Sequence, residues 1–381
     1  MELARQLAKA GHTVFVTDCL PMYVSKFSNA VKKSFTVSDP RKLPDKYIQE
    51  HLELVRKYDI DFLLPIWEDV LYFSQVKEQF LPRCEVFCDN FQTLYKLHHK
   101  WHFMQMLEKW GIPTPPSFLV RNPEEVKNVD IDKPFALKPC LSRASQNVYK
   151  IDDKNEPIDI SVNCGDWIAQ EWLRGDKYCT LSVCHEGNLS AHSVYPVTFS
   201  IDKSSCLSFV SVEHKKIYEW VKDFVKKANF TGLIAFDFIE LEDGRLYPIE
   251  CNPRGTSGLH LFASTPEFPS ALFKSPSNCL FPKEQKKRQI AVGMLMYGWR
   301  VKGQHFLKEF LSSKDVLFSV KDPLPSLLEP FLLLQVLLLA LRQKKNLPAF
   351  YTHDLDWEPG ISDATDVPVE NPLVDQPKSF V

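Results

Sequence analysis

The sequence lacks most of the features that would place it directly in a functional class. Its ten cysteines form no C-x-x-C pair and no regular spacing, which argues against a zinc or disulfide framework and favours a reducing compartment. Acidic and basic residues balance to a formal net charge of -2, so neither nucleic acid nor an anionic membrane is expected as an obligatory partner. The first residues contain no basic stretch followed by an apolar run, and we therefore expect a cytoplasmic protein.

Catalytic and repeat signatures are scarce as well. The sequence contains no G-x-S-x-G turn that would expose a nucleophilic serine, and no internal repeat. Cys84 and Cys88, followed by His98 and His99, could be read as a metal cluster, but the apolar segment around the cysteines is more typical of a short buried strand. What remains is a globular chain, 44% hydrophobic and long enough for two or three lobes.

The N-terminal part has the order of elements of an α/β lobe. Apolar residues between 3 and 10 follow a helical period that ends at Gly11, and the strand-like run HTVFVTD comes directly afterwards. A helix that runs into a strand is the second half of a βαβ unit. We therefore expect a doubly wound lobe over residues 1 to 95, with its first strand missing.

Two further regions follow this lobe. Residues 96 to 273 combine strand-like runs with a helix that ends at Gly111 and a second helix around 213 to 230, which is typical of an α+β domain with antiparallel sheets. Residues 274 to 381 form a helical extension, and its tail from Pro359 is rich in proline and acids and is expected to be disordered.

A hairpin near residue 244 carries the strongest chemical signal. Asp243-Gly244 lies between two apolar runs and predicts a two-residue turn with both residues at positive φ. The pairs that follow from this turn are 242 with 245, 239 with 248 and 237 with 250. Asp237 then lies directly opposite Glu250, and Asn252 lies two residues further on the same face.

Two opposed carboxylates repel each other, so this arrangement needs a compensating charge. Mg²⁺ prefers oxygen ligands from carboxylates and amide carbonyls, completed by water and phosphate when it accompanies a nucleotide. We therefore interpret Asp237, Glu250 and Asn252 as candidate metal ligands. The alternative is an ordinary polar strand end whose charges point apart into solvent.

The same segment resembles a known family. FDFIELEDGRLYPIECNPR is similar to the metal-binding hairpin of the ATP-grasp superfamily, in particular the branch of carbamoyl phosphate synthetase and biotin carboxylase, in which an acid on one strand precedes E-x-N-x-R on the next. The resemblance covers roughly residues 1 to 262. It implies a Rossmann-like pre-ATP-grasp lobe and an ATP-grasp domain that holds ATP between two lobes. It also implies Mg²⁺, with Mn²⁺ as an alternative, at Asp237, Glu250 and Asn252, and a catalytic role for Arg254.

The resemblance implies further nucleotide contacts upstream, from two lysines and a hinge that receives adenine. The matching residues are Lys100, Lys138, Glu171, Trp172 and Leu173. The loop after Lys138 departs from the family's glycine-rich pattern because it contains no glycine. We therefore expect Ser145 and Arg143 to contact phosphate through their side chains.

Such a site is built to transfer the γ-phosphoryl group of ATP to an oxygen nucleophile. In this superfamily the nucleophile is normally a carboxylate, and the acylphosphate is attacked by an amine or another nucleophile. The resemblance thus implies an ADP-forming carboxylate-amine ligase that acts on small molecules. The alternative is a degenerate nucleotide-binding protein with a regulatory or non-catalytic subunit role, which the missing strand and the glycine-free loop would favour.

Residues 331 to 341 form an apolar run near the C-terminus. Eleven helical residues extend about 16 Å, against about 30 Å for a hydrocarbon core, so we expect no transmembrane span. A buried helix or a homodimer-forming helix is the favoured interpretation. Shallow membrane contact through Arg342, Lys344 and Lys345 is the less favoured one.

Overall fold

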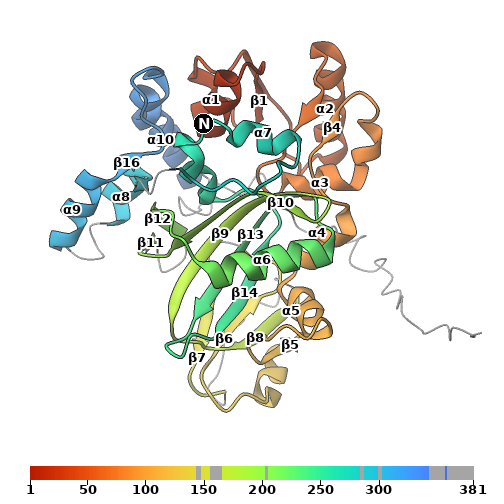
Figure 1. The fold of residues 1–381 in the computed structure, drawn as a ribbon, viewed down its shortest axis with the longest axis vertical. Coiled ribbons are helices and arrows are strands. Elements are labelled where there is room, and N and C mark those ends of the chain that lie inside the picture. Colours follow the sequence, from red (N-terminus) through yellow and green to blue (C-terminus); the bar gives the residue numbers. More distant parts are fainter. Residues whose placement is uncertain are drawn as a thin grey trace, which may run out of the picture.

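The computed structural model describes most of the chain and is shown as a ribbon in Figure 1. The described residues are 1–142, 147–154, 165–201, 205–283, 287–298, 303–342 and Trp357. Arg143 and Ser145, in the expected phosphate loop, and the tail from Pro359 lie outside these residues. The expectations for them therefore stay predictions.

The first part of the chain alternates helices with short strands. The helices and 3-10 turns are α1 (Glu2–Lys9), η1 (Val24–Phe27), α2 (Pro44–Tyr58), α3 (Asp69–Val76), η2 (Lys77–Gln79) and α4 (Phe91–His98). The strands are β1 (Phe15–Asp18), β2 (Lys33–Thr36), β3 (Phe62–Leu63) and β4 (Glu85–Val86). β1 pairs with β2 and β3 with β4, both in parallel. The parallel pairing agrees with the predicted α/β order, but the described strands form two separate ladders where we expected one sheet. Each strand is short, which leaves few hydrogen bonds to extend a sheet.

Antiparallel strands dominate the region after α4, as the sequence predicts. Its helices and 3-10 turns are α5 (Lys100–Lys109), η3 (Pro123–Asn128), α6 (Lys215–Ala228), η5 (Ser257–Ser264) and α7 (Phe268–Phe273). Its strands are β5 (Ser117–Val120), β6 (Phe135–Pro139), β7 (Tyr149–Ile151), β8 (Trp167–Glu171), β9 (Asp176–His185), β10 (Asn188–Pro196), β11 (Phe199–Ile201), β12 (Ser205–Phe209), β13 (Gly232–Glu240) and β14 (Leu246–Asn252). Two antiparallel sheets have the strand orders β5-β8-β6-β7 and β10-β9-β13-β14. Figure 1 shows the first sheet below the second.

α6 covers one side of the second sheet (Figure 1). Its buried apolar residues repeat with helical spacing, and the ring of Phe224 packs 4.9 Å from that of Phe236 in β13. His214 caps the N-terminus of the helix, because its Nδ1 accepts a hydrogen bond from the amide of Ile217. Successive strand residues point to opposite faces, so burying Phe236 under α6 turns Asp237 to the other face of the sheet.

The β13–β14 hairpin departs from the predicted register at its turn and again within β14, and the two one-residue shifts compensate each other. The amide of Leu241 donates to the carbonyl of Arg245 at 2.9 Å, which gives a three-residue turn in which Gly244 takes the positive φ of 78°. The pairs 239–248 and 242–245 are therefore wrong, and residue 238 lies opposite Pro248. A bulge then shifts the register back, so the predicted pairing of Asp237 with Glu250 is confirmed.

The C-terminal elements continue from the preceding region without a break in pairing. They are β15 (Arg288–Gln289), α8 (Ala291–Tyr297), α9 (Gly303–Ser312), β16 (Lys314–Asp315) and α10 (Leu324–Arg342). β15 pairs with β12 and with β16, so one sheet of order β11-β12-β15-β16 joins residues from both sides of the expected boundary at 273.

α10 is longer than the sequence suggested. It begins at Leu324 and contains Pro330, so it has 19 residues where we expected eleven. At about 1.5 Å per residue it extends about 28 Å, and by length and composition it could cross a bilayer. The argument from length against a membrane span was therefore wrong. The error arose because Ser326, Glu329 and Pro330 interrupt the apolar run without ending the helix.

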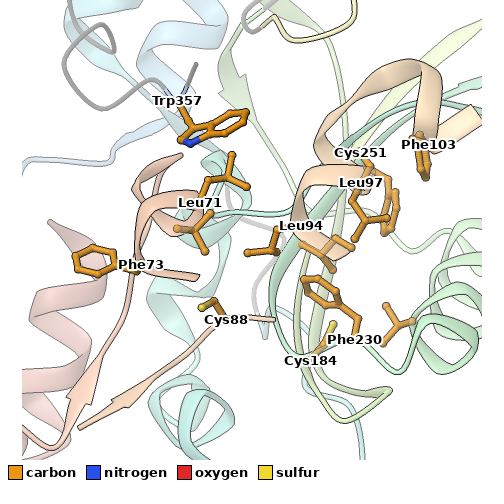
Figure 2. Close-up of a cluster of buried hydrophobic side chains, with 14 of the residues drawn as sticks. Leu71, Phe73, Cys88, Leu94, Leu97, Phe103, Cys184, Phe230, Cys251 and Trp357 are labelled. Carbon is orange, nitrogen blue, oxygen red and sulfur yellow. The ribbon is translucent and has the colours of Figure 1, made fainter. Parts of the chain in front are cut away.

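The largest hydrophobic cluster joins the N-terminal lobe to the second antiparallel sheet (Figure 2). Leu71 and Phe73 come from α3, Leu94 and Leu97 from α4, and Phe230 precedes β13. Cys84 and Cys88 are buried, as predicted. Because this packing is continuous, residues of the N-terminal lobe are held in fixed positions beside the β13–β14 hairpin.

Candidate functional site

Three polar side chains share the face of the hairpin that points away from α6. Asp237 and Glu250 are partners across the ladder, and Asn252 lies opposite Ala235 on the same face. Burial raises the pKa of Asp237 to about 6, and the neighbouring charge of Glu250 acts in the same direction. The expected repulsion between the two carboxylates is therefore present in the folded protein.

Lys138 connects this hairpin to the first antiparallel sheet. Its Nζ donates to Oε1 of Gln170 at 3.0 Å within its own sheet and to the carbonyl of Ile249 at 3.3 Å in the other. Ile249 is the residue of the bulge that has no partner in the register. Burial lowers the pKa of Lys138 to about 8, although Glu250 acts in the opposite direction. A buried ammonium therefore lies between the two sheets and beside the paired carboxylates.

Lys100 reaches the same place from the first residue of α5. Its Nζ donates to the carbonyl of Ser142 at 2.7 Å and lies 3.5 Å from Oε1 of Glu250. The side chain is 3% exposed, and its backbone amide donates to the carbonyl of Cys140. The structure thus brings together Lys100, Lys138 and Glu250, which the sequence places far apart.

Arg254 lies at the end of β14 and faces the N-terminal lobe. Its Nη2 donates to Oδ1 of Asn252 at 3.1 Å, and its guanidinium lies 3.8 Å from the centre of the Trp67 ring. Its Nε is 3.7 Å from Oε1 of Glu68, a carboxylate that is 1% exposed. Protein groups therefore surround the guanidinium on several sides and restrict its position.

Trp67 and Glu68 are site residues that the sequence argument missed. They lie four and five residues after the end of β3, and the loop beyond the carboxyl end of a parallel strand is where α/β proteins usually carry functional side chains. Glu68 and Asp69, which end the apolar run that contains β3, could therefore have been recognised in the sequence as candidate site residues. Glu68 also lies 3.7 Å from Nε2 of His98 and accepts a hydrogen bond from the amide of Trp357 at 2.9 Å.

Two histidines lie at the junction of α4 and α5. His98 and His99 are both nearly buried, and Nδ1 of His99 accepts a hydrogen bond from the amide of His102. His99 therefore caps α5 and so helps to set the position of Lys100.

The expected adenine hinge lies at the end of β8. Oε1 of Glu171 pairs with Nζ of Lys133 at 2.6 Å, and the amide of Trp172 donates to the carbonyl of Pro134 at 2.8 Å. Because the Trp172 amide is already used, an incoming base would need other groups here. Leu173 is half-buried and follows directly.

The donor set on the hairpin suits a divalent cation. Asp237 and Glu250 supply carboxylate oxygens and Asn252 supplies an amide oxygen, all on one face. Burial and the charge of Glu250 raise the pKa of Asp237, whereas the charges of Arg254 and Lys138 act in the opposite direction. A small hard cation with oxygen ligands would add positive charge beside the two carboxylates.

A family comparison matches the part of the chain that carries this geometry. Residues 97–258 match the model of an ATP-grasp domain. A comparison with curated proteins finds no match.

Solved structures share the fold at low sequence identity. The biotin carboxylase domain of 2-oxoglutarate carboxylase from Hydrogenobacter thermophilus, solved with MgADP, ADP and bicarbonate, is 14% identical with a TM-score of 0.58, and the match covers 73% of this chain and 68% of that chain. L-amino acid ligase from Bacillus licheniformis is 15% identical with a TM-score of 0.53, over 69% of this chain and 66% of that chain. N5-carboxyaminoimidazole synthetase from Staphylococcus aureus is 12% identical with a TM-score of 0.55, over 73% of this chain and 75% of that chain. These likenesses support the fold with its antiparallel sheets.

Proposed function

We propose that this chain is an ATP-dependent ligase of the ATP-grasp type, which activates a small carboxylate and joins it to an amine or another nucleophile. The match of residues 97–258 to the model of an ATP-grasp domain supports this proposal. The observation that carries this proposal is the convergence of Lys100, Lys138 and the Asp237–Glu250 pair between two antiparallel sheets. Opposed carboxylates beside buried lysines cost stability, and a protein without a phosphate or metal ligand gains nothing from them.

In this proposal the chain's own residues bind and orient the triphosphate. Lys138 and Lys100 contact phosphate oxygens, and both are already held in place by protein acceptors. Asp237, Glu250 and Asn252 would hold Mg²⁺, or Mn²⁺ in its place. When bound, that ion neutralises charge on the phosphates. Glu171 and Leu173 would receive the adenine base.

The proposed reaction has two steps. A carboxylate oxygen of the substrate attacks the γ-phosphorus, the bond to the β,γ-bridging oxygen breaks, and ADP leaves. The amine then attacks the carbonyl carbon of the acylphosphate, loses a proton, and displaces inorganic phosphate. Arg254, fixed by Glu68 and Asn252, would stabilise negative charge that develops beside it.

The test is ADP release in the presence of Mg²⁺ and pooled carboxylates, with hydroxylamine added to trap an acylphosphate as a hydroxamate. Carboxylate-dependent ADP and hydroxamate formation would support the ligase, with products then identified by mass using pooled amines. The Lys138→Met variant is the matched control, because it removes a phosphate contact and keeps the apolar stem.

The second candidate is a nucleotide-binding protein without ligase activity. The expected phosphate loop contains no glycine, which favours this alternative. If the protein binds ATP saturably but forms no hydroxamate with any member of a broad carboxylate panel, the second candidate is correct. For either function we propose a cytoplasmic setting, which is supported by the lack of disulfides among the described cysteines.

A further inference from the structure

α10 is apolar on all sides, but only one side of it packs against the protein. Leu332, Val336 and Ala340 are buried, and the last two form a small cluster with Leu20 and Leu339. Only 22% of the most apolar window of the helix is buried. A helix that is apolar all round normally lies inside a protein or in lipid, so the outer side of α10 lacks its expected environment.

The outer side carries a continuous row of large apolar side chains. Its members are Leu324, Leu327, Phe331, Leu334, Leu338 and Leu341. They are separated by alternating steps of three and four residues, which places them on one face of the helix. Leu327 is 65% exposed and Phe331 is 69% exposed. Soluble monomers rarely expose so many adjacent large apolar groups, and such a face normally marks an interaction surface.

The exposed charges of the chain segment that contains α10 have one sign. Among the described residues from 306 to 342, the exposed charged side chains are Lys308, Lys314, Lys321 and Arg342. The acids of the same segment are less exposed and engaged: Glu309 pairs with Lys287, and Asp315 accepts backbone amides.

Two other acids of this segment also contribute little negative charge to the surface. Asp322 is buried and pairs with Arg5 at 2.8 Å. Burial raises the pKa of Glu329 to about 7, so near neutral pH its charge is partly lost. The outer face of α10 is therefore apolar, with exposed basic residues at both of its ends, Lys321 just before Leu324 and Arg342 in the last turn. We call these two residues the basic border.

An apolar helix face can be covered by a second copy of the chain, by the interior of a bilayer or by the surface of a bilayer. The structure argues against the first two. In a symmetric dimer the same patch meets itself, so the basic border would face like charges. A span across the bilayer would surround α10 with lipid, but Asp322 anchors the start of the helix to the N-terminal lobe through Arg5, Ser28 and the amide of Asn29. A surface that combines apolar groups with lysines and arginines is complementary to an anionic lipid headgroup layer.

We propose that the outer face of α10 docks onto the surface of an anionic lipid bilayer, with the helix lying in the plane of the membrane. This reverses the order of preference that the sequence suggested, in which a buried or dimer-forming helix came first. The reversal rests on the exposure of the apolar row and on the basic border. The proposal does not depend on the ligase function.

The test is co-sedimentation of the full chain with vesicles of phosphatidylcholine mixed with phosphatidylserine, compared with vesicles of phosphatidylcholine alone. We expect binding to the mixed vesicles that weakens as salt is raised. Phe331→Ser with Leu334→Ser should abolish it without lowering the melting temperature, because both side chains are exposed. Lys321→Ala with Arg342→Ala should weaken binding by about 30-fold.

The matched control is Lys57→Ala with Lys109→Ala, which removes two exposed lysines from α2 and α5, on the side away from α10 in Figure 1. It should bind like the unchanged protein. Equal loss in this control, or no sedimentation with the mixed vesicles, would overturn the proposal. A dimer in light scattering that Phe331→Ser with Leu334→Ser dissociates would decide for a second copy instead. Resistance of the membrane-bound protein to high-pH carbonate extraction would decide for a span.

Discussion

Asp237 lies directly opposite Glu250 across the β13–β14 ladder, although the turn beside them and the strand between them both depart from a regular hairpin. The longer turn shifts the register by one residue, and the bulge at Ile249 shifts it back. The bulge also leaves the carbonyl of Ile249 in the position where it accepts a hydrogen bond from Lys138. One irregularity therefore both restores the carboxylate pair and connects it to the other sheet.

The two carboxylates differ in their partners, so their neutral variants should differ in stability. Asp237 has a pKa raised by burial and by Glu250, and its charge therefore costs stability above a pH of about 6. We expect Asp237→Asn to melt at a higher temperature than the unchanged protein at pH 7 without metal. The difference should shrink as the pH falls from 6 towards 4, where Asp237 in the folded protein takes up a proton.

Glu250→Gln is the matched variant for this comparison. Glu250 lies 3.5 Å from Nζ of Lys100 and, together with Asp237, favours the charged form of Lys138. Its neutral form therefore removes the counter-charge beside Lys100 and one of the two beside Lys138. We expect no gain in stability. Both variants should lose about 10² to 10³ in ADP formation if the pair holds the metal. Full activity in either variant would contradict the metal assignment.

Lys138 should make nucleotide affinity depend on pH. Its pKa is lowered to about 8 by burial, so in the free protein the ammonium is progressively lost as the pH rises through 8. The unfolded chain keeps its proton up to higher pH, so the folded protein should also become more stable over this range. Binding of Mg-ATP, followed by calorimetry between pH 7 and 9.5, should therefore weaken while the melting temperature without ligand rises.

Lys138→Met separates this effect from general pH effects. The variant has no ammonium at this position, so both pH dependences should disappear, and its affinity should be low throughout. If the variant keeps the same fall in affinity above pH 8, another group is responsible.

The part of the site that lies within one hairpin could be predicted from the sequence. Asp237, Glu250 and Asn252 lie within one hairpin, where alternation along the strands decides which side chains share a face. The turn length could not be predicted, because Asp243-Gly244 is compatible with both two-residue and three-residue loops. The side chain and amide of Arg245 both donate to the carboxylate of Asp243 in the observed turn.

Contacts between distant segments were beyond the sequence argument. Glu68 reaches Arg254 only because α3 and α4 pack against the sheet that contains β14, and no local pattern encodes that packing. The pattern of α10 was misread for a similar reason. Apolar residues on every side predict burial, whereas the tertiary structure covers one side and leaves Phe331 exposed.

Glu68 should act as a positioning residue for Arg254. Glu68→Gln keeps the size of the side chain but leaves a buried guanidinium without its carboxylate, which typically costs about 3 to 5 kcal/mol. We expect a lower melting temperature and slower ADP formation. A double-mutant cycle with Arg254→Gln should show coupling, because the second change removes the unpaired charge. Additive losses in the cycle would show that the two residues act separately.

The last prediction concerns the hinge at Glu171. If this residue contributes to recognition of adenine, Glu171→Ala should reduce the preference for ATP over GTP, measured as the ratio of dissociation constants. Lys133→Ala is the matched control, because it removes the other half of the 2.6 Å ion pair. Lys133 is 72% exposed, and exposed ion pairs typically contribute about 0 to 1 kcal/mol, so this variant should fold and bind almost normally. An unchanged ratio in Glu171→Ala, with normal affinity, would remove Glu171 from the nucleotide site. Equal loss of preference in both variants would show that the ion pair acts as a unit, with Lys133 orienting the carboxylate that the base contacts.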